Sequence, residues 1–137
     1  FDLVANTYSI FIGSTTKGGS DGVGTSATFY SPKGVAISSD GTFALVADSY
    51  YCTIRKIVIS TQTVSTIAGY PQSSTCISND GIGTSAKFQT ASGIAFSFDN
   101  SYVLITQTGA IRKLTLSTQE VTLIAGSHSS VDNVFST

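Results

Sequence analysis

Few side chains in this sequence could carry out catalysis. His128 is the only histidine and Glu120 the only glutamate, while Asp40, Asp48 and Asp99 fall at the ends of short apolar runs. A single histidine cannot build a multi-histidine metal site, and no serine stands in a nucleophile turn that a histidine could serve. We interpret His128 as an exposed histidine of a serine-rich tail, and we predict no catalytic residue, no metal ligand and no cofactor.

A glycine-rich run over residues 17–25, KGGSDGVGT, invites comparison with phosphate-binding loops. It lacks the G-x-x-x-x-G-K-[ST] pattern, and no helix follows whose N-terminus could hold an anion. A calcium site would need several more closely spaced oxygen ligands than this loop supplies. We therefore predict a turn, in which Asp21, like Asp80 later in the chain, accepts hydrogen bonds from nearby backbone amides.

Two cysteines, Cys52 and Cys76, are candidates for a disulfide or for metal binding. They are too few for a disulfide-dense miniprotein, and no C-x-x-C motif or histidine cluster accompanies them that would bind zinc. We expect them to pair with each other rather than to remain two buried thiols. A disulfide implies an oxidising compartment, and hence a secreted, extracellular protein.

The composition and net charge of the chain limit the kinds of partner that it can bind. Of the 137 residues, 41% are hydrophobic and only 11% are charged, so one ordinary core is expected, with serine, threonine and glycine supplying the polar surface. The net charge of −1 offers no footprint for nucleic acid. No apolar run approaches the roughly 20 residues that cross a bilayer. Because the chain begins at Phe1 and contains no methionine, we expect a processed form or a part of a longer chain.

The sequence contains an internal repeat with a period of about 60 residues. Residues 21–29, DGVGTSATF, reappear as residues 80–88, DGIGTSAKF. Further matching pairs follow in the same order, with a gap of two residues before the third: 34–38 with 93–97, 43–46 with 102–105, 54–57 with 111–114, and 60–69 with 117–126.

Within one repeat, short apolar or alternating runs are separated by turn residues, a pattern that favours strands over helices. Residues 35–39 and 43–47 flank a hairpin turn at Asp40-Gly41, and residues 54–60 and 64–68 flank Thr61-Gln62. Each repeat is thus predicted to be a four-stranded antiparallel meander, the unit of a β-propeller blade. Aromatic side chains at matching positions are expected in the core: Phe29, Phe88, Phe43 and Tyr102.

Five motifs in fixed order resemble the NHL repeat family. They are D-G-x-G-T-x-A-x-F at 21–29, P-x-G-V-A at 32–36, V-A-D at 46–48, I-R-K-I at 54–57 and V-x-T-x-A-G at 64–69. The resemblance implies an all-β fold of two NHL-like propeller blades, as an incomplete propeller or as part of a repeating assembly. The second copy departs from the pattern, with Ala91 in place of Pro32 and Thr106-Gln107 in place of Ala47-Asp48.

Four segments follow from this alignment. Residues 1–13 are the orphan outer strand of a preceding blade, 14–69 and 70–126 are the two repeats, and 127–137 begin a third repeat or form a tail. The orphan strand is a candidate assembly strand through four apolar side chains: Tyr8, Ile10, Phe11 and Ile12.

Two blades do not close a propeller, which needs about four to eight. The chain is then either part of a longer propeller, or one of several copies in which the orphan strand of one completes a sheet of the next. Strand exchange of the second kind gives a ring or a filament. A free-standing two-blade unit would expose its strand edges to aggregation. In the first two arrangements, apolar blade faces must meet other blade faces.

Loops and charged positions supply the remaining surface predictions. Tyr50, Tyr51 and Tyr70 have no counterpart in the second repeat, so they are candidate contact residues. Some NHL propellers bind RNA through a basic face, but Arg55-Lys56 and Arg112-Lys113 are few, and we interpret them as solvated strand faces that pair with neighbouring blades. The N-x-[ST] sequon is absent, which leaves O-linked glycans on the serine- and threonine-rich loops as the expected modification.

Together these observations predict an extracellular structural and interaction module that is not an enzyme. Its partners would be further NHL-like blades, in the same chain or in identical copies, in a filament or ring. The alternative is a fragment of a six-bladed propeller enzyme, resembling a lyase or hydrolase, whose site lies on blades outside this sequence.

Overall fold

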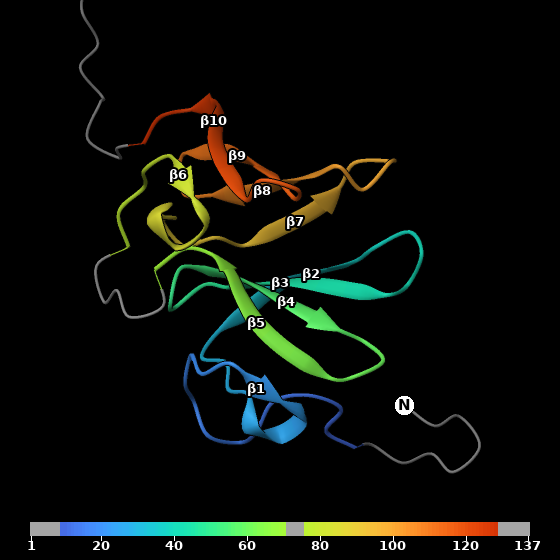
Figure 1. The fold of residues 1–137 in the computed structure, drawn as a ribbon. Coiled ribbons are helices and arrows are strands. Elements are labelled where there is room, and N and C mark those ends of the chain that lie inside the picture. Colours follow the sequence, from blue (N-terminus) through green and yellow to red (C-terminus); the bar gives the residue numbers. More distant parts are fainter. Residues whose placement is uncertain (1–8, 71–75, 129–137) are drawn as a thin grey trace, which may run out of the picture.

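The computed structural model describes residues 9–70 and 76–128, and their regular secondary structure is almost entirely β-strand (Figure 1). They form two five-stranded antiparallel sheets, one from each sequence repeat. Sheet 1 has the order β1 (Gly22–Val23), β5 (Thr63–Ala68), β4 (Thr53–Val58), β3 (Phe43–Asp48) and β2 (Pro32–Ile37). Sheet 2 has the order β6 (Gly81–Ile82), β10 (Glu120–Gly126), β9 (Ala110–Thr115), β8 (Tyr102–Gln107) and β7 (Gly93–Phe96).

The prediction of an all-β fold with two repeated antiparallel meanders is confirmed, but each sheet has one strand more than expected. The DGV segment, predicted as a turn, forms the short strand β1, in which Gly22 pairs with Val64 and Val23 with Thr63. A single turn of 3-10 helix, η1 (Gly24–Ser26), follows it. The second repeat has the same addition in β6 and η2 (Gly83–Ser85). A run of two paired residues is too short to leave an alternating pattern in the sequence.

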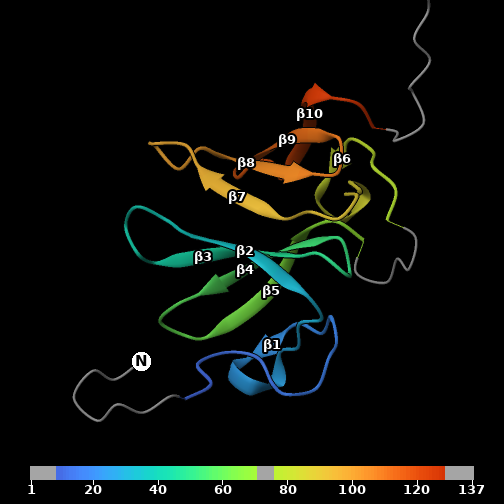
Figure 2. The same cartoon turned by 180° about the vertical axis from the view of Figure 1, so that it is seen from behind.

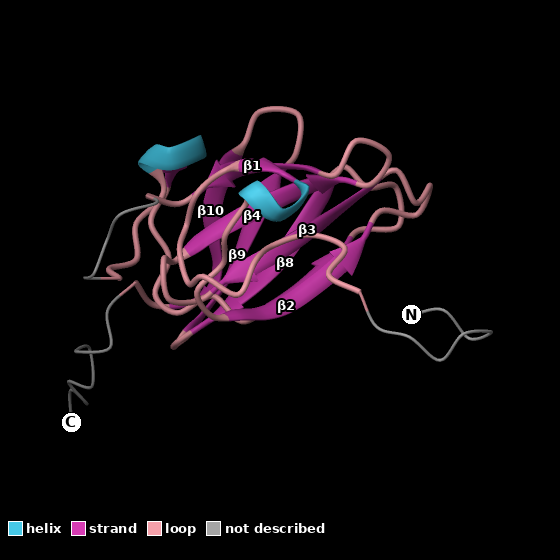
Figure 3. Ribbon diagram, turned by 90° about the horizontal axis from the view of Figure 1, so that it is seen from below, coloured by secondary structure: helices cyan, strands magenta, loops and turns pink. Residues whose placement is uncertain are grey.

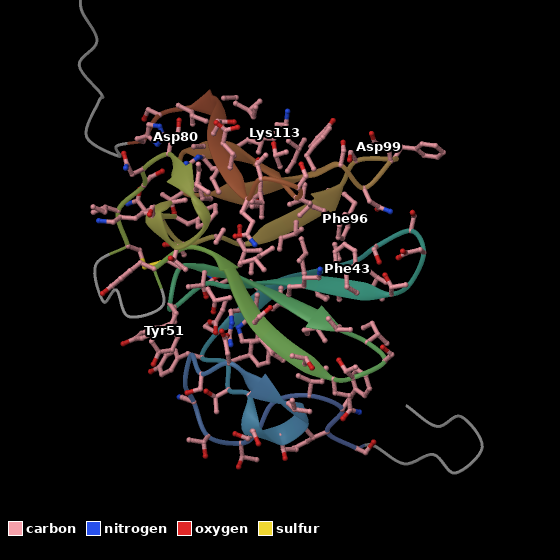
Figure 4. The ribbon with its side chains drawn as sticks, viewed as in Figure 1. Phe43, Tyr51, Asp80, Phe96, Asp99 and Lys113 are labelled. Atoms are coloured by element: carbon pink, nitrogen blue, oxygen red, sulfur yellow. A yellow bond between two sulfur atoms is a disulfide. The ribbon has the colours of Figure 1, made fainter. Side chains whose placement is uncertain are left out.

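The two sheets stack face to face, with β2 lying against β7, as the opposite views in Figures 1 and 2 show. The strands of both sheets run in similar directions when seen from below (Figure 3). Phe43 of sheet 1 meets Phe96 of sheet 2 edge to face between the sheets, with ring centroids 5.6 Å apart (Figure 4). Gly34 permits the close approach, because a Cβ atom there would collide with the backbone carbonyl of Ser92.

Two apolar clusters result from the alternation of side chains along the strands. The larger one fills the space between the sheets, and its buried members include Leu45, Ile54, Phe88, Ile105 and Leu114. The smaller one lies on the opposite side of sheet 1 and is built on Ala27, Ala44, Val46, Ile57 and Val64, with Phe29 and Ile12 packed against it. Phe88 is therefore a core residue as predicted, whereas Phe29, Phe43 and Tyr102 are only partly buried.

The disulfide between Cys52 and Cys76 is confirmed, with the two Cα atoms 6.0 Å apart. It joins the loop before β4 in sheet 1 to the segment that leads into sheet 2. A second tie is the hydrogen bond that the Ser49 hydroxyl donates to the carbonyl of Ala91. Both bonds connect the sheets at the same end, so they fix one sheet against the other in addition to the apolar contacts.

The predicted assembly strand lies partly outside the described residues, which begin after Tyr8. Residues 9–13 are not in a strand within the single chain. Ile10 and Phe11 are exposed, and Ile12 packs against the smaller apolar cluster. Pairing of this segment with the sheet of another chain stays a prediction, as does a third repeat beginning within 127–137.

We predict that Gly34→Ala lowers the free energy of unfolding by about 2 kcal/mol, because the added methyl group forces β2 away from the Ser92 backbone. Val35→Thr, one position along the strand and pointing away from sheet 2, is the matched control and should change it by at most about 0.5 kcal/mol. Denaturant unfolding monitored by circular dichroism measures both. Equal stabilities for the two variants would contradict the close packing of the sheets at this point.

Candidate functional site

A fully buried arginine is the main polar group of each sheet. Arg55 on β4 donates from Nη2 to the Asp21 carboxylate at 2.8 Å and to the Ser20 carbonyl at 2.8 Å, and from Nη1 to the Thr28 carbonyl at 3.1 Å. Its guanidinium lies 5.0 Å from the centre of the Phe29 ring. Arg55 thus fixes the whole segment from Ser20 to Phe29 on the sheet.

The predictions for these charged residues were wrong in two respects. Arg55 and Arg112 are buried rather than part of a solvated basic face. Asp21 does not serve its own turn: besides Arg55 it accepts hydrogen bonds from the backbone amide and hydroxyl of Thr66, far along the chain. The sequence pattern gave no sign of this, because a strand pairs residues that are distant in the sequence. Lys56 and Lys113 are partly exposed and lie over the rings of Phe43 and Tyr102.

The second repeat keeps the arginine but changes its partners. Arg112 Nη2 lies 2.6 Å from Asp80 Oδ1, while Gln107 stands where the first repeat has the fully buried Asp48, which lies 3.8 Å from Arg55. Sheet 2 therefore has one carboxylate near its arginine where sheet 1 has two. Burial lowers the pKa of the Arg112 guanidinium from its ordinary value, and the charge of Asp80 opposes that change.

A serine, a histidine and an aspartate meet beside Arg112, an arrangement that the sequence did not predict. Ser78 Oγ lies 3.0 Å from His128 Nδ1, and His128 Nε2 lies 3.5 Å from Asp80 Oδ1. The Ser78 oxygen also accepts hydrogen bonds from Arg112 Nη1 and Gln107 Nε2, both at 2.7 Å. These two donors occupy both lone pairs of the hydroxyl, whereas a nucleophile needs one of them free. The group is therefore a hydrogen-bond junction that holds His128 over Asp80.

Other chemistry finds little support among the residues that the structure describes. No three His, Cys, Asp or Glu side chains within residues 9–70 and 76–128 lie close enough to share a metal ion. Asp40 and Asp99 sit in equivalent hairpin turns and accept hydrogen bonds from neighbouring hydroxyls and amides, so these carboxylates do not converge. The described part of the chain has no helix of the length and apolarity that a membrane span requires.

The outer face of sheet 2, which points away from sheet 1, displays apolar residues whose counterparts are buried. Leu104, Ile111 and Ile124 on this face are 38%, 38% and 53% exposed. The matching residues of sheet 1 are Leu45, Ile54 and Ile67, which are 0%, 0% and 8% exposed because sheet 2 covers them. The chain thus has two surfaces of this kind: the one on sheet 1 is covered by sheet 2, and the one on sheet 2 is exposed.

The outer face of sheet 1 shows the reverse relation. Val35 and Ile37 on β2 are 66% and 63% exposed, whereas their counterparts Ile94 and Phe96 on β7 pack into the core between the sheets. A groove of about 250 Å³ runs beside Val35 and is lined by Ile12, Phe29, Pro32, Lys33, Gly34, Val46 and Ile57. The packing of sheet 2 on sheet 1 is a joint made of two unlike surfaces, which form its two halves. The outer face of sheet 2 repeats the sheet 1 half of this joint, and the outer face of sheet 1 repeats the sheet 2 half.

The three tyrosines predicted as contact residues lie in loops at one end of sheet 1. Tyr50 and Tyr70 are 48% and 51% exposed, and Tyr51 is partly buried against Gly19. Tyr51 is visible at the edge of the molecule in Figure 4. Tyr30, which sequence reasoning did not single out, packs against Tyr50 with ring centroids 3.7 Å apart.

No protein-family model matches the chain, and no curated protein matches it. Solved structures do. A protein of unknown function from Bacteroides thetaiotaomicron VPI-5482 matches 86% of this chain with a TM-score of 0.60 and 19% identity. An auxiliary nutrient binding protein from Bacteroides ovatus ATCC 8483 matches 74% with a TM-score of 0.55 and 18% identity. A candidate phosphatase from Bacteroides thetaiotaomicron VPI-5482 matches 86% with a TM-score of 0.63 and 19% identity.

At this level of identity the similarity concerns the fold alone. The matched regions make up 26%, 26% and 27% of those three chains, so this chain spans about a quarter of the length of the structures that it resembles. The class defined by fold and surface is an all-β protein of two stacked antiparallel sheets with an apolar residue set on each outer face.

We expect Arg55→Met to lower the free energy of unfolding by about 3 kcal/mol, because it leaves the carbonyls of Ser20 and Thr28 without their donor. Lys56→Met, the next residue on β4, is the matched control and should stay within about 0.5 kcal/mol of the parent. Urea unfolding followed by fluorescence measures the difference. A loss in Arg55→Met no larger than in the control would show that the arginine does not hold the segment.

Stability should also depend on the Asp99 turn at low pH. Hydrogen bonds from the Ser101 amide, and from the Ser97 and Ser101 hydroxyls, lower the pKa of Asp99 from 3.8 to about 2. Because the folded chain has the lower pKa, the stabilisation is complete above about pH 4 and is lost as the pH falls from there towards 2. Asp99→Asn should flatten the dependence of unfolding free energy on pH in this window, and an unchanged slope would argue against the assignment.

Proposed function

We propose that the chain is an extracellular structural and interaction module, whose two sheets are NHL-like blades that pack against further blades. The observation that carries the proposal is the relation between the outer faces. Leu104, Ile111 and Ile124 repeat the surface that receives a sheet inside the chain, and Val35 and Ile37 repeat the surface that is received. Exposed apolar residues that repeat the pattern of a buried contact between sheets favour an interaction site on these faces.

The two faces differ from each other, which determines the kind of assembly. If both faces carried the same half of the joint, no two chains could form it with each other, because the joint needs one half of each kind. Unlike halves at opposite sides produce head-to-tail contacts, which give a ring where the rotation closes and a filament where it does not. Further repeats within one longer chain would pack through the same two faces. The pairing of faces is therefore the same in an assembly of copies and in a longer chain.

Secretion is supported by the disulfide, because such bonds persist in oxidising compartments. The chemistry of the surface agrees with this, since hydroxyl and glycine residues provide most of its polarity. O-linked glycans on the hydroxyl-rich loops belong to the same proposal. Intact-mass measurement of native material tests them directly, because any sugar adds to the 14.2 kDa of the chain.

Two variants, each with one outer face blocked, test the face pairing between copies. In the first, Val35→Asp and Ile37→Asp place carboxylates on the outer face of sheet 1. In the second, Leu104→Asp and Ile111→Asp do so on sheet 2. Each variant alone should be monomeric, because burying an unpaired carboxylate in an apolar joint is unfavourable. An equimolar mixture should give a one-to-one heterodimer and nothing larger, measured by light scattering and sedimentation.

Phe98→Asp is the control, because Phe98 is fully exposed at a hairpin tip and belongs to neither outer face. It should assemble like the parent. A homodimer of either blocked variant alone, or assembly that either variant leaves unchanged, would contradict head-to-tail pairing. Should the parent stay monomeric, a chain extended by a third repeat tests the pairing within one chain, and a gain in unfolding free energy is then the expected result.

A further inference from the structure

A cluster of three tyrosines at one end of sheet 1 is not required by the repeat fold. Tyr30 packs against Tyr50 with ring centroids 3.7 Å apart and the ring planes tilted by 34°, and Tyr51 meets both rings edge on, at 6.1 and 5.5 Å. The second repeat has Gln89 in place of Tyr30, and its shorter β8–β9 turn has no counterpart of the other two. The same sheet therefore forms without these rings, which suggests a role other than folding.

An open cavity of about 410 Å³ on the surface adjoins the cluster at the boundary of the two sheets. It is lined by Ser31, Lys33, Ser49, Tyr50, Cys76 and Thr90. The volume falls in the range of small-molecule sites, roughly 300 to 1,000 Å³. Thr90 has a φ of 55°, which is unfavourable for a β-branched residue, and strained residues of this kind gather at binding sites.

The charge at this corner is positive and unbalanced. Lys33 lines the cavity, and the ammonium of Lys17 lies 5.2 Å from the centre of the Tyr30 ring. Among the ion pairs of the described residues, none includes either lysine. Asp48 lies at the same end, but it is fully buried and accepts hydrogen bonds from the amides of Tyr30 and Ser31. No carboxylate lines the cavity to neutralise the lysine.

We propose that this corner binds an acidic saccharide. The exposed half of Tyr50 offers a flat apolar face for a pyranose ring, Lys33 faces its carboxylate or sulfate, and the Ser31 and Thr90 hydroxyls can exchange hydrogen bonds with sugar hydroxyls. An aromatic face together with a lysine and hydroxyl groups suits this class better than a phosphate ion, which has no apolar surface. The site is separate from the outer faces, so it does not rest on the proposed assembly.

Titration of the disulfide-bonded chain with a galacturonic acid trisaccharide tests the proposal, with the neutral galactose trisaccharide as the paired ligand. Calorimetry gives the affinity, and amide chemical shifts give the location. The acidic sugar should bind at least about tenfold more tightly than the neutral one, and its affinity should fall as salt is added. Tyr50→Ala should weaken binding about tenfold and Lys33→Gln about fivefold, whereas Tyr50→Phe should bind like the parent.

Tyr70→Ala and Lys56→Gln are the matched controls, since both residues lie outside the cavity lining. Each should bind like the parent, and each variant's amide spectrum reports that the fold is kept. Equal affinity for acidic and neutral sugars would overturn the proposal. So would full binding by Tyr50→Ala, or inorganic phosphate shifting the same amides with the affinity of the sugar, which would make the corner a general anion site.

Discussion

The buried arginine of each repeat is the interaction on which the structure most depends. Arg55 and Arg112 each join the central part of a sheet to the segment that precedes its first long strand, through one carboxylate and two or more carbonyl or hydroxyl oxygens. That segment supplies the fifth strand, the 3-10 turn and the ring that covers the guanidinium. A charge buried in this way is costly unless its hydrogen bonds are made, so the segment and the sheet must form together.

The second constraint is the alternation of side chains, which gives every sheet two apolar faces rather than one. In a sandwich, one face of each sheet meets water and is polar. Here β3, β4 and β5 each have buried residues on both sides, and on β3 Ala44 and Val46 face one way and Leu45 and Ala47 the other. A chain of two such sheets buries the joint between them and leaves the outer apolar face of each sheet exposed. The proposed interaction surface is thus a direct result of the repeat pattern and needs no additional motif.

Much of the fold could be predicted from the sequence, because the repeat places turn residues and apolar runs in the same order twice. The long strands, the hairpin turns and the cysteine pair all follow from local chemistry. The partners of Arg55 and Asp21 could not be predicted, since they depend on contacts between residues 27 to 45 positions apart. The junction of Ser78 and His128 and the contact of Tyr30 with Tyr50 were missed for the same reason: each joins a loop to a distant segment.

The disulfide and the Ser49 hydrogen bond tie sheet 1 to sheet 2, whereas the tight Thr108-Gly109 turn of the second repeat keeps a hydroxyl in Thr108, the counterpart of Ser49, but has no cysteine that could tie sheet 2 to a following sheet. In a stack of such chains, the joints within a chain and the joints between chains would share their apolar contacts but differ in mechanical strength. A fibre built in this way would dissociate between chains under tension or on dilution. It would release intact two-sheet chains whose outer faces are free to associate again.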